Sequence, residues 1–201
     1  MSQRRIITEQ DVLAVEPGGL LEAPESSIIT PLARETASAC RVRIILSEGL
    51  RRKVIGLGAD HGGFEVKEQL KPWLDELGYA HKDFGTHGSA AVDYPDFAFA
   101  VANAVAKGDC DLGIILDGAG IGSCMTANKV PGVRAAMCYD AETAKNSREH
   151  NYANVLTLGA RLRPLELLRE IVKVWLATDY GEERHGRRVR KIMDVEKRYL
   201  R

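Results

Sequence analysis

From Lys53 onward, short apolar runs alternate with longer amphipathic stretches. Four of the apolar runs are typical of buried strands: residues 53–60 (KVIGLGAD), 111–118 (DLGIILDG), 134–140 (RAAMCYD) and 153–160 (ANVLTLGA). Strands that alternate with helices indicate βα units on a parallel sheet. We therefore expect an α/β domain over residues 53–201, a Rossmann-like three-layer αβα sandwich with a parallel sheet of about five strands.

The stretches between these runs have helical spacing. Residues 64–79 place apolar side chains near every third or fourth position and end around Gly78, and residues 94–108 have Pro95 in the first turn and Gly108 at the end. Further helices are expected at residues 141–151, at residues 165–181 closing on Gly181, and in a basic tail at residues 184–200. Ligands of such folds bind at the carboxyl ends of the strands.

The first fifty residues follow a different pattern. A short helix is expected at residues 7–15, a turn-rich stretch at 17–27, then a helix capped at Thr30 and Pro31, and a strand. We interpret residues 1–50 as a separate N-terminal appendage, joined to the main domain through residues 47–53 (SEGLRRK).

Composition narrows the function. The chain of 201 residues has 28 basic and 28 acidic residues, which favours a small-molecule ligand over nucleic acid or a membrane surface. The four cysteines lack CxxC spacing, so we expect reduced, buried thiols, no structural zinc and a cytoplasmic location. No apolar run reaches the roughly 18 residues of a membrane span, and the N-terminus lacks a signal-peptide core.

Polar residues follow the first strand of the main domain. Asp60 and His61 precede Gly62 and Gly63 and a helix start. Asp60 has two interpretations of about equal weight, a helix N-cap or a ligand-binding carboxylate. The two glycines favour the second, because they let a ligand approach the helix amides closely.

A glycine-rich turn, DGAGIGS, follows the second strand. Gly118, Gly120 and Gly122 could expose amides as an anion hole for a phosphate or an enediolate; a tight structural turn is the alternative. The turn lacks the Gly-Lys-Ser/Thr ending of a Walker loop. Asp140 follows a strand at nearly the distance of a dinucleotide-binding acid, which leaves the nucleotide interpretation weakened but open.

Two further groups of residues are candidates for binding. His150 and Asn151 lie at a predicted helix end, where a histidine is more often a helix C-terminal cation or a surface side chain. Arg184 and Arg188 are four residues apart in the basic tail and would share one helix face. They are either a solvated face or a two-pronged phosphate clamp.

Together these segments resemble the family of ribose-5-phosphate isomerase B and galactose-6-phosphate isomerase. The resemblance covers about three quarters of the chain and rests on GADHGGFEVKEQL, DYPDFA, GAGIGSCMTANKVPGVRAAMC, SREHNYANVLTLGARL and RHGRR, in order and at family spacing. It implies interconversion of an aldose and a ketose phosphate through a cis-enediolate, without metal or cofactor. It also implies a homodimer, or a tetramer built from it, with the site between two chains.

The resemblance assigns roles by position. His150 matches the histidine that opens the sugar ring, and Asp60 matches the carboxylate that assists at ring oxygen and hydroxyls. Asn151 and the amides of Gly118 to Gly122 match the enediolate site. The residues that match the phosphate-binding set are His61, Arg161, Arg184 and Arg188.

The position of the catalytic base departs from the family. Many members have cysteine where this chain has Asp117 and threonine where it has Ala119, and others have glutamate where it has Ser123. A carboxylate becomes a stronger base in a dry pocket, so we favour Asp117 as the base of a ribose 5-phosphate isomerase. The alternatives are an isomerase of a tetrose or hexose phosphate, or a non-catalytic sugar-phosphate-binding or scaffold subunit.

The appendage has a resemblance of its own. IITEQDV and ITPLARE are similar to leader segments on proteins of bacterial microcompartments. This implies a docking or cargo element that binds shell or cargo proteins and a location inside a protein shell. The alternative is an extension that packs on the dimer.

Overall fold

The computed structural model describes residues 5–47 and 52–200, and it divides the chain into two compact units, Met1–Arg52 and Lys53–Arg201. Each unit has its own hydrophobic core. Residues 48–51 of the expected connecting segment lie outside the described residues.

The first unit contains two small parallel sheets and two helices. The elements are β1 (Ile6–Ile7), α1 (Glu9–Leu13), β2 (Leu20–Pro24), β3 (Ile28–Ile29), α2 (Pro31–Cys40) and β4 (Arg43–Ser47). β1 pairs with β3, and β2 pairs with β4. The predicted cap of α2 is confirmed, because Thr30 Oγ1 accepts a hydrogen bond from Ala33 N–H at 3.2 Å and Pro31 opens the helix.

The expectation of an irregular turn over residues 17–27 was wrong in part. Residues 20–24 form β2, in which Leu21 and Ala23 are buried while their neighbours are more exposed. This period of two is the pattern of a half-buried strand, and the glycines and prolines around it obscured the pattern. β1 and β3 are two residues each, too short for any periodicity.

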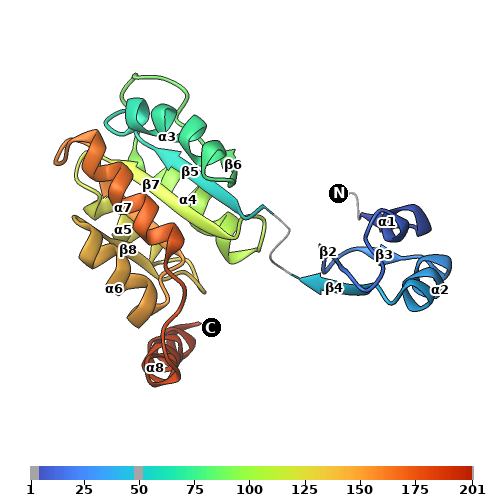
Figure 1. Cartoon of the computed structure of the whole chain (residues 1–201). Helices are drawn as coiled ribbons and strands as arrows, with labels where there is room; N and C mark the ends of the chain where they lie inside the picture. The colour runs from blue at the N-terminus through green and yellow to red at the C-terminus, as the bar shows by residue number, and fades with distance from the viewer. Residues whose placement is uncertain (1–4, 48–51, 201) are drawn as a thin grey trace. The chain divides into compact units, whose positions relative to one another are not determined.

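The second unit is built on a five-stranded parallel sheet, and the predicted fold class is confirmed (Figure 1). The strands are β5 (Val54–Ala59), β6 (Ala80–Asp83), β7 (Leu112–Asp117), β8 (Ala135–Met137) and β9 (Val155–Gly159), in the order β6-β5-β7-β9-β8. The four strands named from the sequence are present. The fifth, β6, was missed because its residues, AHKD, are not an apolar run and are only partly buried.

Helices cover both faces of the sheet. One face packs against α3 (Phe64–Glu76), α6 (Ala141–Asn151) and α7 (Leu165–Ala177), the other against α4 (Tyr94–Ala106) and α5 (Ile121–Ala127). β7 shows how the sequence divides between these layers: Ile114 and Leu116 face the first core, and Ile115 faces the second. Alternation of this kind is required of a central strand buried on both sides.

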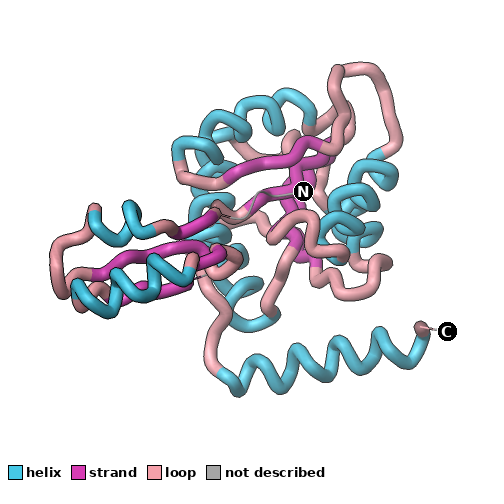
Figure 2. Tube along the Cα trace, turned by 90° about the vertical axis from the view of Figure 1, so that its right-hand side faces the viewer, coloured by secondary structure: helices cyan, strands magenta, loops and turns pink. Residues whose placement is uncertain are grey.

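The helices expected in the second unit are present, and some of them end at other residues than expected. α7 ends at Ala177, four residues before Gly181, which lies in the following loop. The last helix, α8 (Glu183–Tyr199), runs beside the rest of the unit to the C-terminus (Figure 2). Cys110 and Cys138 are buried as expected, whereas Cys40 and Cys124 are only partly covered. None of the described helices has the length and apolar character needed to cross a membrane.

Candidate active site

Three of the predicted site residues lie together at the carboxyl ends of the central strands, where the strand order changes direction. From β5 the chain crosses to β6 on one side and then to β7 on the other, and ligands of such sheets bind between strands that diverge in this way. Asp60 directly follows β5 and Asp117 ends β7, and the register pairs Ala59 with Leu116. Arg161 lies just beyond β9, the other neighbour of β7.

Asp117 is 4 % exposed and bonds to the turn that follows it. Its Oδ1 accepts hydrogen bonds from the N–H groups of Ala119, at 2.7 Å, and Gly120. Its Oδ2 accepts one from Ser123 N–H at 3.0 Å. The Gly120 amide that the sequence assigned to an enediolate is therefore occupied by the protein's own carboxylate. The N–H groups of Gly118 and Gly122 donate to no other described residue.

The glycines of this turn are required by close packing. Gly120 has φ of +80°, and a Cβ there would lie 2.8 Å from the Leu158 carbonyl carbon. A Cβ on Gly122 would lie 2.5 Å from Cζ of Tyr94. A side chain at position 120 would therefore collide with the backbone of β9, and one at position 122 with Tyr94 of α4, so both positions require glycine. Tyr94 was not singled out from the sequence, where a tyrosine in a helical first turn carries no functional signal.

Asp60 also hydrogen-bonds to backbone amides. Oδ1 accepts from Gly62 N–H at 2.8 Å and from Gly63 N–H at 3.0 Å, in the turn before α3. The N-cap of α3 is Gly63, so the N-cap interpretation of Asp60 was wrong. Oδ2 makes no hydrogen bond to another described residue, so one carboxylate oxygen is left for a ligand. His61 Nδ1 lies 3.3 Å from both the nitrogen and the carbonyl oxygen of Val92, so either tautomer of the ring has a backbone partner there and Nε2 is left as the second polar atom of the ring.

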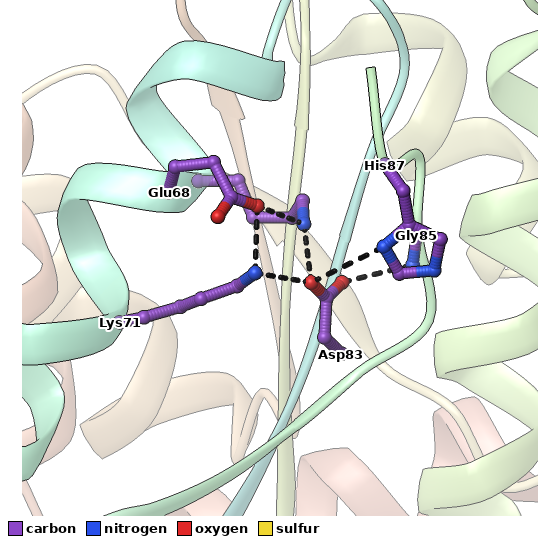
Figure 3. Close-up of polar contacts among 6 residues, drawn as sticks. Glu68, Lys71, Asp83, Gly85 and His87 are labelled. Atoms are coloured by element: carbon purple, nitrogen blue, oxygen red, sulfur yellow. Dashed lines mark hydrogen bonds and ion pairs between the residues drawn. The ribbon is translucent and has the colours of Figure 1, made fainter.

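A network of two lysines and two carboxylates lies next to the strand and turn that carry Asp60. Lys67, fully buried on α3, lies 2.6 Å from Asp83 Oδ2 and 2.8 Å from Glu68 Oε1, and Lys71 contacts both carboxylates. Figure 3 shows Asp83 at the centre of this network, with Gly85 and His87 on its other side. Gly85 and Thr86 in turn hydrogen-bond to Ala59, directly before Asp60.

The remaining predicted residues form a second group at the junction of α6 and α8. His150 and Asn151 end α6, and the His150 ring stacks on His185 of α8 with centroids 4.1 Å apart. Arg184 and Arg188 lie in α8 and are exposed. Burial lowers the pKa of His185, and the nearby charges of His150, Arg184 and Arg188 lower it further, which favours a neutral ring.

Within the described residues, no hydrogen bond or ion pair joins the two groups. Asp60, His61, Asp117, the glycine turn and Arg161 lie at the sheet edge; His150, Asn151, Arg184 and Arg188 lie at the α6–α8 junction. Among the described residues no three His, Cys, Asp or Glu side chains are grouped as metal ligands. Asp140, the candidate for dinucleotide binding, caps α6 instead, because Thr143 N–H donates to its Oδ1 at 2.7 Å.

A groove of about 720 Å³ lies between α8 and β8. Its lining includes Ala135, Ala136, Asn151, Ile192, Val195 and Tyr199. The α8 side chains in it are open to solvent, with Val195 52 % and Tyr199 83 % exposed.

Comparisons with known proteins match the second unit to sugar-phosphate isomerases. The family profile described as Ribose/Galactose Isomerase matches residues 55–192. Ribose-5-phosphate isomerase B of Escherichia coli is 43% identical over 146 residues, 73% of this chain and 98% of that protein. D-erythrulose-4-phosphate isomerase of Pectobacterium atrosepticum is 37% identical over 139 residues, 69% and 91% of the two chains. The solved structure of ribose-5-phosphate isomerase B from Clostridium thermocellum is 49% identical with a TM-score of 0.72, covering 73% of this chain and 99% of that one.

Proposed function

We propose that this chain, which belongs to the ribose/galactose isomerase family, interconverts an aldose phosphate and a ketose phosphate. The observation that carries the proposal is a buried carboxylate, Asp117, at the switch point of a sheet of this family, between Asp60 and Arg161. Ribose 5-phosphate is the first substrate to test.

The proposed reaction moves a proton between two carbons of the open-chain sugar. Asp117 removes the proton from C2 of the aldose, the C–H electrons form the C1–C2 double bond, and the π electrons of the C1 carbonyl move to O1, which gives an enediolate. The proton then returns from Asp117 to C1, the C1–C2 double bond opens as the C2 carbonyl forms, and the proton of the C2 hydroxyl passes to O1. His150 and Asp60 assist ring opening at the ring oxygen and hydroxyls. The phosphate is bound by four side chains: His61, Arg161, Arg184 and Arg188.

The hydrogen bonds of Asp117 define which lone pair serves as base. A carboxylate has about four lone-pair positions, and three N–H groups fill two on Oδ1 and one on Oδ2. One lone pair of Oδ2 remains. The same three bonds fix the carboxylate, so the reacting lone pair has a defined direction.

A non-catalytic sugar-phosphate-binding or scaffold subunit is the second candidate, favoured by the replacement of the family's usual base. Turnover of tetrose, pentose and hexose phosphates by the native chain and by Asp117→Asn separates the two. An isomerase exchanges the C2 hydrogen of one of these substrates with solvent and loses at least about a hundredfold in kcat in the variant. A binding subunit shows no exchange with any of them, and its affinity is kept or improved in the variant.

Asp140→Asn is the matched control. It makes the same change at a carboxylate that accepts a backbone N–H as a helix cap and is not one of the candidate site residues. Asparagine is an equally good N-cap, so this variant should keep full turnover.

A homodimer would complete the site. Two observations support it: the two groups of predicted residues are not joined within one chain, and α8 exposes Ile192, Val195 and Tyr199. In a dimer, His150, Arg184 and Arg188 of one chain would face Asp60 and Asp117 of the other. A tetramer would pair two such dimers.

Residues 1–52 are proposed to be a docking or cargo element for a microcompartment shell in the cytoplasm. In support, this unit has its own core and lies outside the family match at residues 55–192. Co-sedimentation with shell proteins should be lost when residues 1–52 are removed; sedimentation that persists in the shortened chain would contradict the proposal.

A further inference from the structure

Asn146 lies one helical turn before His150 on α6 and bonds to its ring. The Nδ2 atom of Asn146 lies 2.9 Å from His150 Nδ1. Side chains four residues apart on a helix share one face, so the two groups meet without any distortion of the backbone. Asn146 is exposed, and its side chain bonds to no other described residue.

This bond determines where the neutral His150 ring carries its proton. An amide nitrogen donates hydrogen bonds and does not accept them, so Nδ1 of His150 is the acceptor. The hydrogen bond at one ring nitrogen sets the protonation of the other, and the proton therefore lies on Nε2. Nε2–H has no hydrogen-bond partner among the described residues, which leaves it available to a ligand.

A second contact restricts the orientation of the same ring. One face of His150 stacks on His185, with centroids 4.1 Å apart and planes inclined by 15°. His185 is 6 % exposed, and the chain just before α8 is held to the end of α6, because the Tyr152 hydroxyl donates to the Gly181 carbonyl at 2.9 Å. The stacked face and the bond at Nδ1 together limit rotation of the His150 ring.

We propose that Asn146 is a positioning residue for His150: by donating to Nδ1 it keeps the proton on Nε2, from which the ring donates a hydrogen bond to the ring oxygen of a closed sugar phosphate. The proposal rests on the proposed function, in which His150 assists ring opening. In that step the bond between C1 and the ring oxygen breaks, and its electron pair moves to the oxygen. The proton of the C1 hydroxyl passes to this oxygen as the C1 carbonyl forms. The ring oxygen offers only lone pairs, so a donor at Nε2 stabilises the negative charge that develops there.

Aspartate at residue 146 would reverse the arrangement. A carboxylate only accepts, so Nδ1 would carry the proton, and the lone pair of Nε2 would face the lone pairs of the ring oxygen. Aspartate and asparagine have nearly the same shape, and the position is exposed, so the fold should be kept. Asn146→Leu removes the bond at Nδ1 without reversing it.

Nitrogen NMR of isotope-labelled histidine rings in the full chain at alkaline pH tests the tautomer directly. His150→Gln identifies the His150 signals among those of the five histidines. We expect the proton on Nε2 in the native chain and on Nδ1 in Asn146→Asp. A native ring with its proton on Nδ1, or the same tautomer in both chains, would overturn the proposal. This measurement does not depend on turnover.

A closed and an open substrate separate ring positioning from general damage to the site. Ribose 5-phosphate forms a closed ring, whereas ribulose 5-phosphate is open because its phosphate blocks the 5-hydroxyl. We expect Asn146→Asp to lower kcat/KM for ribose 5-phosphate about tenfold, the effect of one hydrogen bond to a developing charge. Exchange of a C1 hydrogen of ribulose 5-phosphate with deuterated solvent needs no ring opening and should stay within about twofold of the native rate. Asn146→Leu should lose less than Asn146→Asp, and equal losses in the two reactions would overturn the proposal.

Lys145→Leu is the matched control. Lys145 is the exposed neighbour of Asn146 on α6 and pairs with Glu149 at 3.6 Å, so this variant alters the same helix without removing the bond to His150. It should match the native chain in the tautomer and in both reactions. A native chain that neither converts ribose 5-phosphate nor exchanges ribulose 5-phosphate would refute isomerase activity, and the tautomer measurement would then decide the role of Asn146.

Discussion

The Lys67 side chain is fully buried. Its ammonium pairs with Asp83 and Glu68, which would keep Lys71 as partner in its absence but would lose the hydrogen bonds that Lys67 donates from inside the protein. We expect Lys67→Met to lower the free energy of unfolding by about 3 kcal/mol, measured as a lower midpoint of the larger calorimetric transition. Because the network supports the Asp60 loop, kcat/KM should fall as well.

Lys71→Met is the matched control for this prediction. Lys71 binds the same two carboxylates, but its side chain is 21 % exposed, so water replaces part of what is lost. Its cost should be about 1 kcal/mol. Equal losses in the two variants would mean that burial of Lys67 does not set its contribution.

Asp83 makes the stability of the second unit sensitive to acid. Burial acts to raise its pKa, but hydrogen bonds from Lys67, Lys71 and Gly85 N–H outweigh this and hold the pKa at about 2, against an ordinary 3.8. A depressed carboxyl pKa stabilises the fold above the ordinary value, and this contribution is lost as pH falls from about 4 to 2. Asp83→Asn should reduce the acid-induced loss over that window by about 2 kcal/mol in calorimetry. A slope identical to that of the native chain would contradict the prediction.

Single residues show what sequence reasoning can supply and where it stops. Asp60 and Asp117 are identifiable because each follows a strand and precedes glycines. The sequence does not tell which carboxylate oxygens bond to backbone amides and which remain for a ligand. The geometry of each turn decides this; at Asp117, for example, it brings back the N–H of Ser123, six residues further along the chain. The grouping of Arg161 with the Asp60 turn came from the family resemblance and not from local pattern, because about one hundred residues separate them and the order of the strands brings them together.

At the scale of elements, α8 leaves the large apolar side chains of Ile192, Val195 and Tyr199 exposed. The groove beside it is proposed to take a second copy of the chain, so a charge within it should prevent assembly. Val195→Glu should reduce the mass in light scattering from twice the chain's 22.1 kDa to that of one chain. Turnover should fall with it, because the two groups of site residues would separate.

Lys197→Glu is the control for this helix. Lys197 lies on α8 outside the groove lining, so a charge change there should leave assembly intact. A Val195→Glu chain that keeps the native mass would exclude this groove as the interface. A native mass of four chains would indicate the tetramer.

Elements with strong periodicity were predictable, and those without it were not. α3, α4, α6 and α7 have the spacing and terminal signals of helices, and the central strands are continuous apolar runs. β6 is short and polar, and it forms a strand because it pairs with β5 at the sheet edge. β2 depends in the same way on pairing with β4, 23 residues further along the chain. Pairing of this kind is a tertiary effect that local sequence does not report.

At the scale of the whole molecule, the two units are expected to be energetically separate. The core of the first is formed by residues between Ile7 and Val42, and those of the second by residues from Ile55 onward. A chain reduced to residues 53–201 should therefore keep the larger calorimetric transition within about 2 °C and retain its turnover. A large shift of that transition would show that the first unit contributes to the stability of the second.

The position of the two tryptophans makes the second unit separately visible by fluorescence. Trp73 is on α3, and Trp175 on α7 is fully buried, with Nε1 hydrogen-bonded to Ser147 and its ring against Arg148. No tryptophan occurs in residues 1–52. Indole emission on excitation at the red edge of the aromatic band thus arises from residues 53–201 alone. Unfolding of the second unit could therefore be followed by tryptophan fluorescence in the intact chain, without a contribution from residues 1–52.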